Sequence, residues 1–137
     1  MKKMIVVIVL IFSHPAMAAG SSVPYGMGGN FSRFDPVVAQ YNQSGELFRI
    51  EGHCQSACTL FLSIRNVCID RSATLLFHAG HNRQREMTNS ATSHMLGAYN
   101  AALREYVTAN HYMDTLAFHA ISGRDMIGKF GYRACPK

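Results

Sequence analysis

Short apolar runs separated by glycine or polar turns predict several strands along the chain. Residues 46–51 carry three apolar side chains between two glycines, which is typical of a short and largely buried strand. Residues 67–69 and 73–77 are also apolar and compatible with β-structure, and the polar residues 70–72 separate them. These two runs are therefore predicted to form two strands or one bent strand.

Two helices are predicted around the first strand. Asp35 followed by Pro36 is typical of a helix start, because Asp caps the first turn and Pro needs no N–H at the first helical position. Gly45 is expected to end this helix. Apolar residues at helical spacing then predict a second helix over residues 56–65, directly after the strand.

The second half of the chain is predicted to hold two further helices after a polar segment. Residues 79–90 are polar, and we expect them to form a mobile loop over a site. Apolar residues follow the i, i+3, i+4 rule over residues 95–107, which predicts a core helix. A second apolar stripe predicts a helix over residues 113–121 that Gly123 closes. The predicted fold class is α/β, with a short sheet flanked by helices.

The first 18 residues have the pattern of a secretory signal peptide. Lys2 and Lys3 precede an apolar run over residues 4–12, and the small-x-small residues 16–18 predict cleavage after Ala18. The run is too short to span a bilayer, so no stable membrane anchor is expected after cleavage. The predicted location is secreted or periplasmic, and an uncleaved N-terminal anchor is the alternative.

The mature chain is predicted to be one domain without a nucleic-acid partner. Removing 18 of the 137 residues leaves 119, which supports one core. Residues 19–30, rich in Gly and Ser, are predicted to be a flexible lead or a turn, and residues 31–137 the domain. Loss of the two signal lysines lowers the formal charge from +5 to +3, and the basic residues 83–85 are interpreted as a solvated loop. That charge is too small and scattered for nucleic-acid binding.

All four cysteines lie in the mature part, and an oxidising compartment favours two disulfides. Four cysteines allow three pairings, which the sequence alone does not separate. We favour Cys54 with Cys58 and Cys68 with Cys135, because the second bond would clamp the C-terminal tail to the core.

Metal and nucleotide sites have only weak signals. The Cys-x3-Cys and His-x2-His spacings are not specific for zinc, and disulfides compete for the thiols. The glycines of residues 26–29 lack the spacing of a nucleotide fingerprint and follow no predicted strand. We therefore expect neither a metal nor a cofactor, and zinc binding through Cys and His is kept as a third hypothesis.

Ser56 lies between two cysteines where a predicted strand meets a predicted helix. Such corners expose a nucleophile, and the first N–H groups of the helix can stabilise an oxyanion. The alternative is that Ser56 only caps the helix, as serine commonly does. His78 ends the predicted strand 73–77, at a sheet edge where α/β proteins place their sites. The other mature histidines are interpreted as surface or satisfied core residues: His53, His81, His94, His111 and His119.

The order of these motifs resembles the proteolytic subunit of Clp proteases. The matching segments are Gly28-Gly29, residues 52–58 and residues 77–80, with a helix and a strand between the first two and a helix and a strand between the last two. The chain looks most like the exported, disulfide-containing relatives, which share a Cys-x-Ser-x-Cys pattern. The resemblance implies a ClpP/crotonase-like α/β domain over residues 31–137. Because Pro24 makes residues 22–25 a poor strand, we expect the early strands of that fold to be absent.

The resemblance also implies a Ser-His-Asp site. Ser56 matches the nucleophile and His78 the base, and Asp125 of an Arg-Asp pair matches the third member, with Asp114 its nearest rival. The implied oxyanion donors are the N–H groups of Ala57 and Gly29.

Two function classes follow from this pattern. The first is an exported serine hydrolase that cleaves peptides or small acyl substrates without metal or nucleotide. The second is a catalytically inactive exported module for binding or assembly, in which Ser56 is only a helix cap. Whether the chain forms oligomers stays open at this point.

Overall fold

A computed structural model describes residues 8–11 and 20–137. The predicted signal peptide lies mostly outside these residues, and residues 8–11 belong to no helix or strand. The elements are, in chain order, β1 (Gly20–Ser21), η1 (Val23–Tyr25), α1 (Phe31–Ser44), β2 (Phe48–Ile50), β3 (His53–Gln55), η2 (Ser56–Ser63), β4 (Val67–Ile69), β5 (Thr74–Phe77), α2 (Asn89–Gly97), α3 (Ala101–Ala109), β6 (His119–Ser122) and α4 (Gly123–Gly128).

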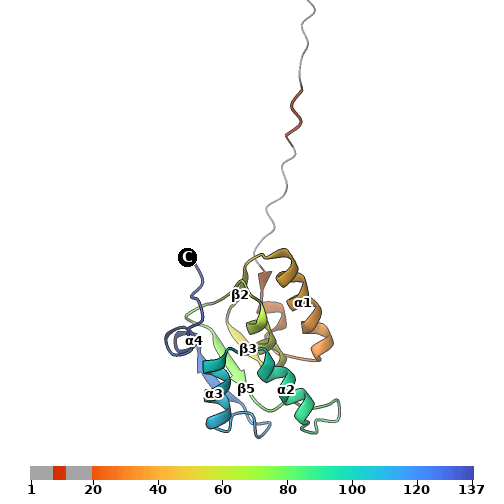
Figure 1. The fold of residues 1–137 in the computed structure, drawn as a ribbon, viewed down its shortest axis with the longest axis vertical. Helices are drawn as coiled ribbons and strands as arrows, with labels where there is room; N and C mark the ends of the chain where they lie inside the picture. Colours follow the sequence, from red (N-terminus) through yellow and green to blue (C-terminus); the bar gives the residue numbers. More distant parts are fainter. Residues whose placement is uncertain (1–7, 12–19) are drawn as a thin grey trace, which may run out of the picture.

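The strands form two small three-stranded sheets, so the predicted α/β class holds at the level of mixed helices and sheets. One sheet has the parallel order β1-β2-β4, and the other has the order β3-β5-β6, in which β5 and β6 are antiparallel. The predicted run 67–77 forms two strands, one in each sheet. Figure 1 shows α1 at one side of the strands and α3 and α4 at the other.

The helix before β2 begins earlier than predicted and ends where predicted. Asn30 is the N-cap of α1, so Pro36 lies inside the helix rather than at its first position. Gly45 ends the helix with a φ of 73°, a left-handed conformation that favours glycine. Phe34 of α1 packs against Phe61 of η2, with ring centroids 5.3 Å apart.

Residues 20–30 lie in the range predicted to be a flexible lead or a turn, and they contain the short strand β1 and the 3-10 turn η1. Gly20 and Ser21 form a parallel pair with β2, so an early strand is present although it is short. Ser22 is fully buried, and its hydroxyl accepts a 2.9 Å hydrogen bond from the Glu51 N–H. These bonds fix the segment against the sheet, because buried polar groups need partners that the sheet supplies.

Two helix predictions in the second half are wrong. The segment 95–107 is broken into α2 and α3, because Asn100 starts a new helix by accepting a hydrogen bond from the Leu103 N–H. The segment 113–121 forms turns and then β6, in which Ile121 pairs with Leu75 of β5. A strand partner distant in sequence therefore overrides the local helical spacing.

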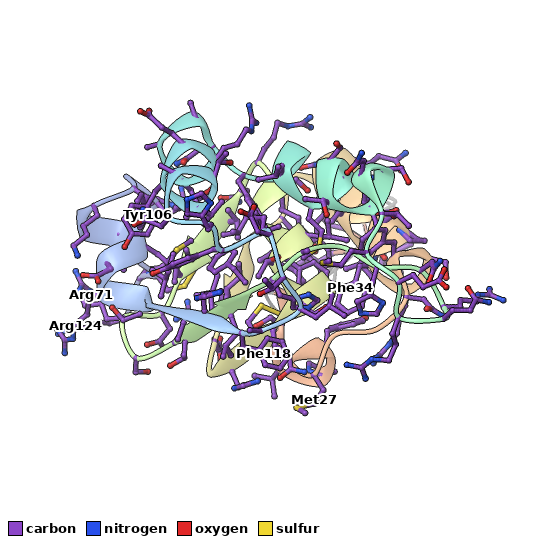
Figure 2. All side chains as sticks on the ribbon, turned by 90° about the horizontal axis from the view of Figure 1, so that it is seen from below. Met27, Phe34, Arg71, Tyr106, Phe118 and Arg124 are labelled. Atoms are coloured by element: carbon purple, nitrogen blue, oxygen red, sulfur yellow. A yellow bond between two sulfur atoms is a disulfide. The ribbon has the colours of Figure 1, made fainter. Side chains whose placement is uncertain are left out.

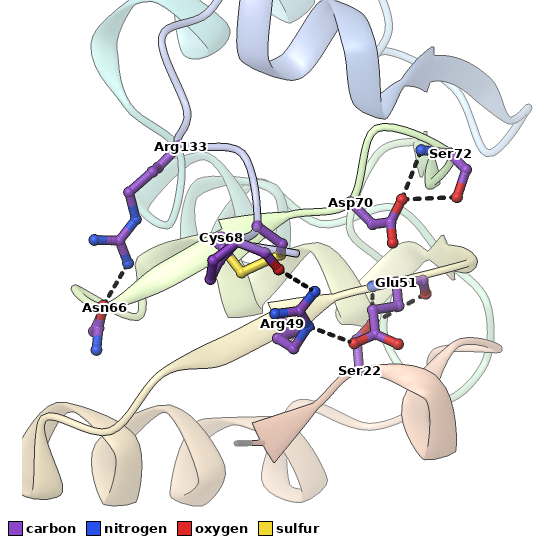
Figure 3. The surroundings of a disulfide bond; sticks show 10 residues. Ser22, Arg49, Glu51, Asn66, Cys68, Asp70, Ser72 and Arg133 are labelled. Atoms are coloured by element: carbon purple, nitrogen blue, oxygen red, sulfur yellow. Dashed lines mark hydrogen bonds and ion pairs between the residues drawn. A yellow bond between two sulfur atoms is a disulfide. The ribbon is translucent and has the colours of Figure 1, made fainter. Parts of the chain in front are cut away.

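The structure forms the favoured disulfides, Cys54 with Cys58 and Cys68 with Cys135. The second bond holds the C-terminal tail to β4, as Figure 3 shows. The tail also pairs with the strand directly, because the Cys135 N–H donates to the Ile69 carbonyl at 3.0 Å. Disulfides of this kind are typical of proteins from an oxidising environment.

No helix among residues 8–11 and 20–137 is long and apolar enough to cross a membrane.

Candidate active site

A cavity of about 530 Å³ lies where β3 and β5 end. Four stretches of chain contribute to its wall: residues 27–31, 55–56, 78–85 and 116–118, together with Met95 of α2. Ser56, His78 and Gly29 all line this one cavity. The fold thus brings three of the predicted site residues to one place.

Ser56 is the first residue of η2 and directly follows β3, as predicted, although η2 is a 3-10 helix rather than an α-helix. Its φ is 57°, a left-handed conformation that costs a non-glycine residue roughly 1–2 kcal/mol. The Ser56 hydroxyl makes no hydrogen bond to any described residue, and Gln55, not Ser56, occupies the N-cap position of η2. Ser56 therefore does not cap the helix through its side chain.

The segment that carries the predicted oxyanion glycine is tied to the same junction. The Gln55 N–H donates to the Gly26 carbonyl at 2.9 Å, and the Gln55 side-chain amide donates to the Met27 carbonyl at 3.0 Å. A Cβ atom on Gly28 would lie only 2.9 Å from the Ser56 Cβ, so the glycine turn and the β3–η2 junction are in close contact there. Gly29 follows with a φ of 144° and lines the cavity.

Ala57 lies in the first turn of η2 and is fully buried. The first N–H groups of a helix have no partner within the helix, so they are free to receive a developing negative charge. Gly29 lines the cavity, whereas Ala57 directly follows Ser56 in η2 and does not line it. Their role as oxyanion donors stays a prediction.

His78 lies directly after β5 and is 4% exposed. Its Nδ1 is 2.6 Å from the Ala79 carbonyl oxygen. Because a carbonyl oxygen only accepts, Nδ1 carries the proton, and the neutral ring keeps an electron pair on Nε2. This is the tautomer that a general base needs.

The surroundings of His78 also keep it neutral. Burial lowers the pKa of His78 below its ordinary value of 6.5. The hydrogen bond to Ala79 opposes this effect, while the positive charges of Arg85 and of protonated His81 add to it. At neutral pH His78 is therefore predominantly an uncharged base.

Two aromatic rings hold the His78 ring in place. The His81 ring stacks on it with centroids 5.8 Å apart, and the Phe118 ring meets it edge-on at 5.2 Å. The interpretation of His81 as a surface or satisfied core residue misses its place in the cavity. The one sequence signal for it is the His-x2-His spacing at the start of the polar segment 79–90.

The structure does not bring Asp125 to His78. Asp125 lies in the first turn of α4, where its carboxylate pairs with the Lys129 ammonium group at 3.3 Å. Figure 2 shows the neighbouring Arg124 at one end of the molecule, away from Met27 and Phe118, which line the cavity. The Ala79 carbonyl occupies the Nδ1 side of His78 that an aspartate would take in a triad.

Asp114, the rival candidate, is not at the site either. Its carboxylate pairs with the exposed His111 ring at 2.7 Å, and it does not line the cavity. Neither predicted carboxylate lines the cavity, whereas Ser56 and His78 both do, and the Nδ1 of His78 contacts the Ala79 carbonyl instead of an aspartate.

The polar segment after His78 contributes more to the cavity than predicted. Its residues His81, Asn82, Arg83 and Arg85 line the wall, whereas Arg83 and Arg85 were expected to belong to a solvated loop. Their position shortly after His78 is the signal that could have marked them. The loop predicted over residues 79–90 lines the cavity and ends where α2 begins at Asn89, and a bridge between His81 and Met87 pairs its two sides. Its mobility stays a prediction.

Both thiols beside Ser56 are used in the Cys54–Cys58 disulfide, and the described residues contain no free cysteine. Within the same residues no group of three or more His, Cys, Asp or Glu side chains is arranged to hold a metal ion. The cysteines that the zinc hypothesis requires as thiolate ligands are therefore bonded to each other as disulfides.

No protein-family model, no curated protein and no solved structure matches this chain. Sequence and fold similarity therefore assign no family.

Proposed function

We propose that this protein is an exported serine hydrolase that cleaves peptide or related acyl bonds with Ser56 as the nucleophile. The observation that carries the proposal is Ser56 in a left-handed conformation at the β3–η2 junction, in one cavity with a neutral His78. Catalytic nucleophiles often lie at a strained strand-to-helix turn that exposes their side chain. The motif order that resembles the Clp proteolytic subunit points to the same chemistry.

The reaction would proceed through an acyl-enzyme. The Ser56 Oγ attacks the substrate carbonyl while the His78 Nε2 takes the hydroxyl proton, and the N–H groups of Ala57 and Gly29 stabilise the oxyanion. His78 then returns the proton to the leaving group as the carbonyl–heteroatom bond breaks. His78 then takes a proton from water, which attacks the ester, and returns this proton to the Ser56 Oγ as the acyl–oxygen bond breaks and the acid product leaves. The Ala79 carbonyl keeps the imidazole tautomer and orientation through both steps.

Export is part of the proposal. The leader pattern of residues 1–18 predicts secretion, and two disulfides fit an oxidising compartment. The proposed location is therefore extracellular or periplasmic.

A serine-directed fluorophosphonate probe tests the nucleophile. We expect covalent labelling of the wild-type protein and its complete loss in Ser56→Ala. Ser63→Ala is the matched control, because Ser63 lies in the same helix, its hydroxyl donates to the Leu60 carbonyl, and it does not line the cavity. Its labelling should equal that of the wild type.

The opposite outcome supports the second function class. If the folded wild-type protein takes no label, Ser56 is not an activated nucleophile, and the chain is better described as an inactive binding or assembly module. Labelling that survives in Ser56→Ala would instead place the nucleophile elsewhere.

A further inference from the structure

Positive charge and apolar surface meet in the cavity beside Ser56. Arg83 and Arg85 line it from the loop after β5, while no described Asp or Glu side chain contributes to its wall. Met27 and Phe118 line the same cavity and are strongly exposed apolar residues, at 74% and 51%. A ligand with only polar or only apolar groups would leave one part of this wall without a partner.

The two arginines are held at the cavity without being neutralised. Within residues 20–137, neither the Arg83 nor the Arg85 side chain forms an ion pair or a hydrogen bond. The one acidic side chain of the loop, Glu86, accepts a 3.0 Å hydrogen bond from the Asn82 amide instead. Exposed, unpaired guanidinium groups are ready to bind a carboxylate.

The loop has a defined shape that positions these side chains. The Asn82 Oδ1 accepts hydrogen bonds from the N–H groups of Gln84 and Glu86, both at 3.0 Å. Arg85 has a φ of 60°, a left-handed conformation that the surrounding turn holds. A regular turn of this kind orients Arg83 and Arg85 with a smaller ordering cost than a disordered loop would.

We propose that the cavity selects peptides that carry a carboxylate next to an apolar side chain. This inference rests on the proposed function for its site and names the substrate class. The apolar side chain would pack against Met27 and Phe118, and Arg83 and Arg85 would bind the carboxylate, which belongs either to an acidic side chain or to a free C-terminus. Cationic peptides would be disfavoured by like-charge repulsion.

Matched fluorogenic peptides test the proposal. One pair differs only by Glu or Gln beside an apolar residue, and a second pair differs only by a free or amidated C-terminus. We expect wild-type kcat/KM to favour the charged member of at least one pair by roughly tenfold, the scale of two partly exposed ion pairs. The pair that shows the preference identifies the source of the carboxylate.

Charge removal at the cavity provides the second arm. In Arg83→Gln/Arg85→Gln the ratio of kcat/KM values should fall to about one, and the preference should weaken with added salt in the wild type. Arg71→Gln/Arg124→Gln removes the same charge from exposed residues at the end of the molecule away from Met27 and Phe118 (Figure 2), so it should keep the preference.

Binding to Ser56→Ala, followed by fluorescence anisotropy of labelled peptides, separates the two proposals. If the wild type does not cleave but the charged peptide binds more tightly, and only the Arg83/Arg85 substitutions abolish this, the serine hydrolase proposal fails and the substrate class stands. Equal binding of both members of each pair, no binding of any peptide, or a preference that survives in Arg83→Gln/Arg85→Gln would overturn the inference.

Discussion

Backbone strain is concentrated at the cavity. Three described non-glycine residues have a positive φ: Ser56, Arg85 and His111. Two of the three line the cavity, and the third is an exposed turn residue. Such conformations cost free energy and persist where the surrounding structure holds them, which is common at functional sites. At the scale of single residues, strain thus selects the same place as the chemistry of Ser56 and His78.

The pH dependence of hydrolysis follows from the neutral state of His78. Only the unprotonated ring accepts the Ser56 proton, so kcat/KM should rise with pH through the pKa of His78. Because burial lowers this pKa below 6.5, the midpoint should lie below 6.5 and activity should be on its plateau at pH 7. A pH profile of kcat/KM with an uncharged ester substrate measures it.

Two variants sharpen this measurement. His78→Gln should lower kcat/KM by roughly 10²–10⁴-fold at every pH, the usual range for a general base. Arg85→Gln removes one of the positive charges that lower the pKa of His78, so it should move the midpoint upward. A midpoint at or above 6.5 in the wild type would contradict the conclusion that burial lowers the pKa of His78.

Local sequence context correctly places Ser56 at the start of η2 and His78 at the end of β5, but it does not reveal which group lies beside His78. Strand-to-helix and strand-end positions are local properties, so both residues could be chosen before the structure. Asp125 could not be judged in this way, because Ser122 caps α4 through a hydrogen bond from the Asp125 N–H and thereby fixes Asp125 at the start of a helix far from His78. A backbone carbonyl such as that of Ala79 leaves no sequence signal at all.

Among the elements, the turn over residues 26–29 and the β3–η2 junction act as one unit. Gly28 has a φ of 76°, and a Cβ there would meet the Gln55 carbonyl oxygen and the Ser56 Cβ, each at 2.9 Å. Gly45 has nearly the same φ of 73° but has no atom within 4 Å of such a Cβ. Alanine at Gly45 would therefore add only the cost of the left-handed φ, whereas alanine at Gly28 would add the same cost and a steric clash.

Substitution of these glycines by alanine tests the unit. Gly45→Ala should lower the free energy of unfolding by roughly 1–2 kcal/mol through the left-handed φ alone. Gly28→Ala should lower the free energy of unfolding by about a further 1–3 kcal/mol, because the methyl group displaces the β3–η2 junction that carries Ser56. Urea denaturation measures both, and fluorophosphonate labelling should slow strongly only in Gly28→Ala. Equal labelling of the two variants would show that the turn does not position Ser56.

The elements that the sequence predicts well are those fixed by their own residues. Gly45 ends α1, and the apolar runs around residues 48–50, 67–69 and 74–77 form strands, because turn glycines and short apolar stretches act locally. The stripe over 113–121 does not form a helix, since β5 supplies a strand partner that helical spacing cannot reveal. In the same way, the order of residues 20–30 comes from pairing with β2 and from the buried Ser22.

At the scale of the whole molecule, the two disulfides have different positions relative to the site. Cys68–Cys135 joins residues 67 positions apart and holds the tail, to which Arg49 adds a 3.0 Å hydrogen bond at the Pro136 carbonyl (Figure 3). Cys54–Cys58 joins residues only 4 positions apart and encloses Ser56. The first connects distant parts of the fold, whereas the second constrains the β3–η2 junction that carries Ser56.

Paired removal of each disulfide should therefore separate stability from activity. In the chain-entropy model, Cys68→Ala/Cys135→Ala should lower the free energy of unfolding by about 4 kcal/mol, and Cys54→Ala/Cys58→Ala by about 2 kcal/mol, because the second loop is much shorter.

Labelling of Ser56 should change in the opposite order. The variant without Cys68–Cys135 should react at nearly the wild-type rate while it is folded, and the variant without Cys54–Cys58 should react at least tenfold more slowly, since about 1 Å of misplacement can cost roughly a hundredfold. Denaturation curves and labelling rates of the two variants, measured at a temperature where both are folded, give the comparison. A larger loss of stability in Cys54→Ala/Cys58→Ala, together with unchanged labelling, would show that this bond is a structural clamp and not a support for the nucleophile.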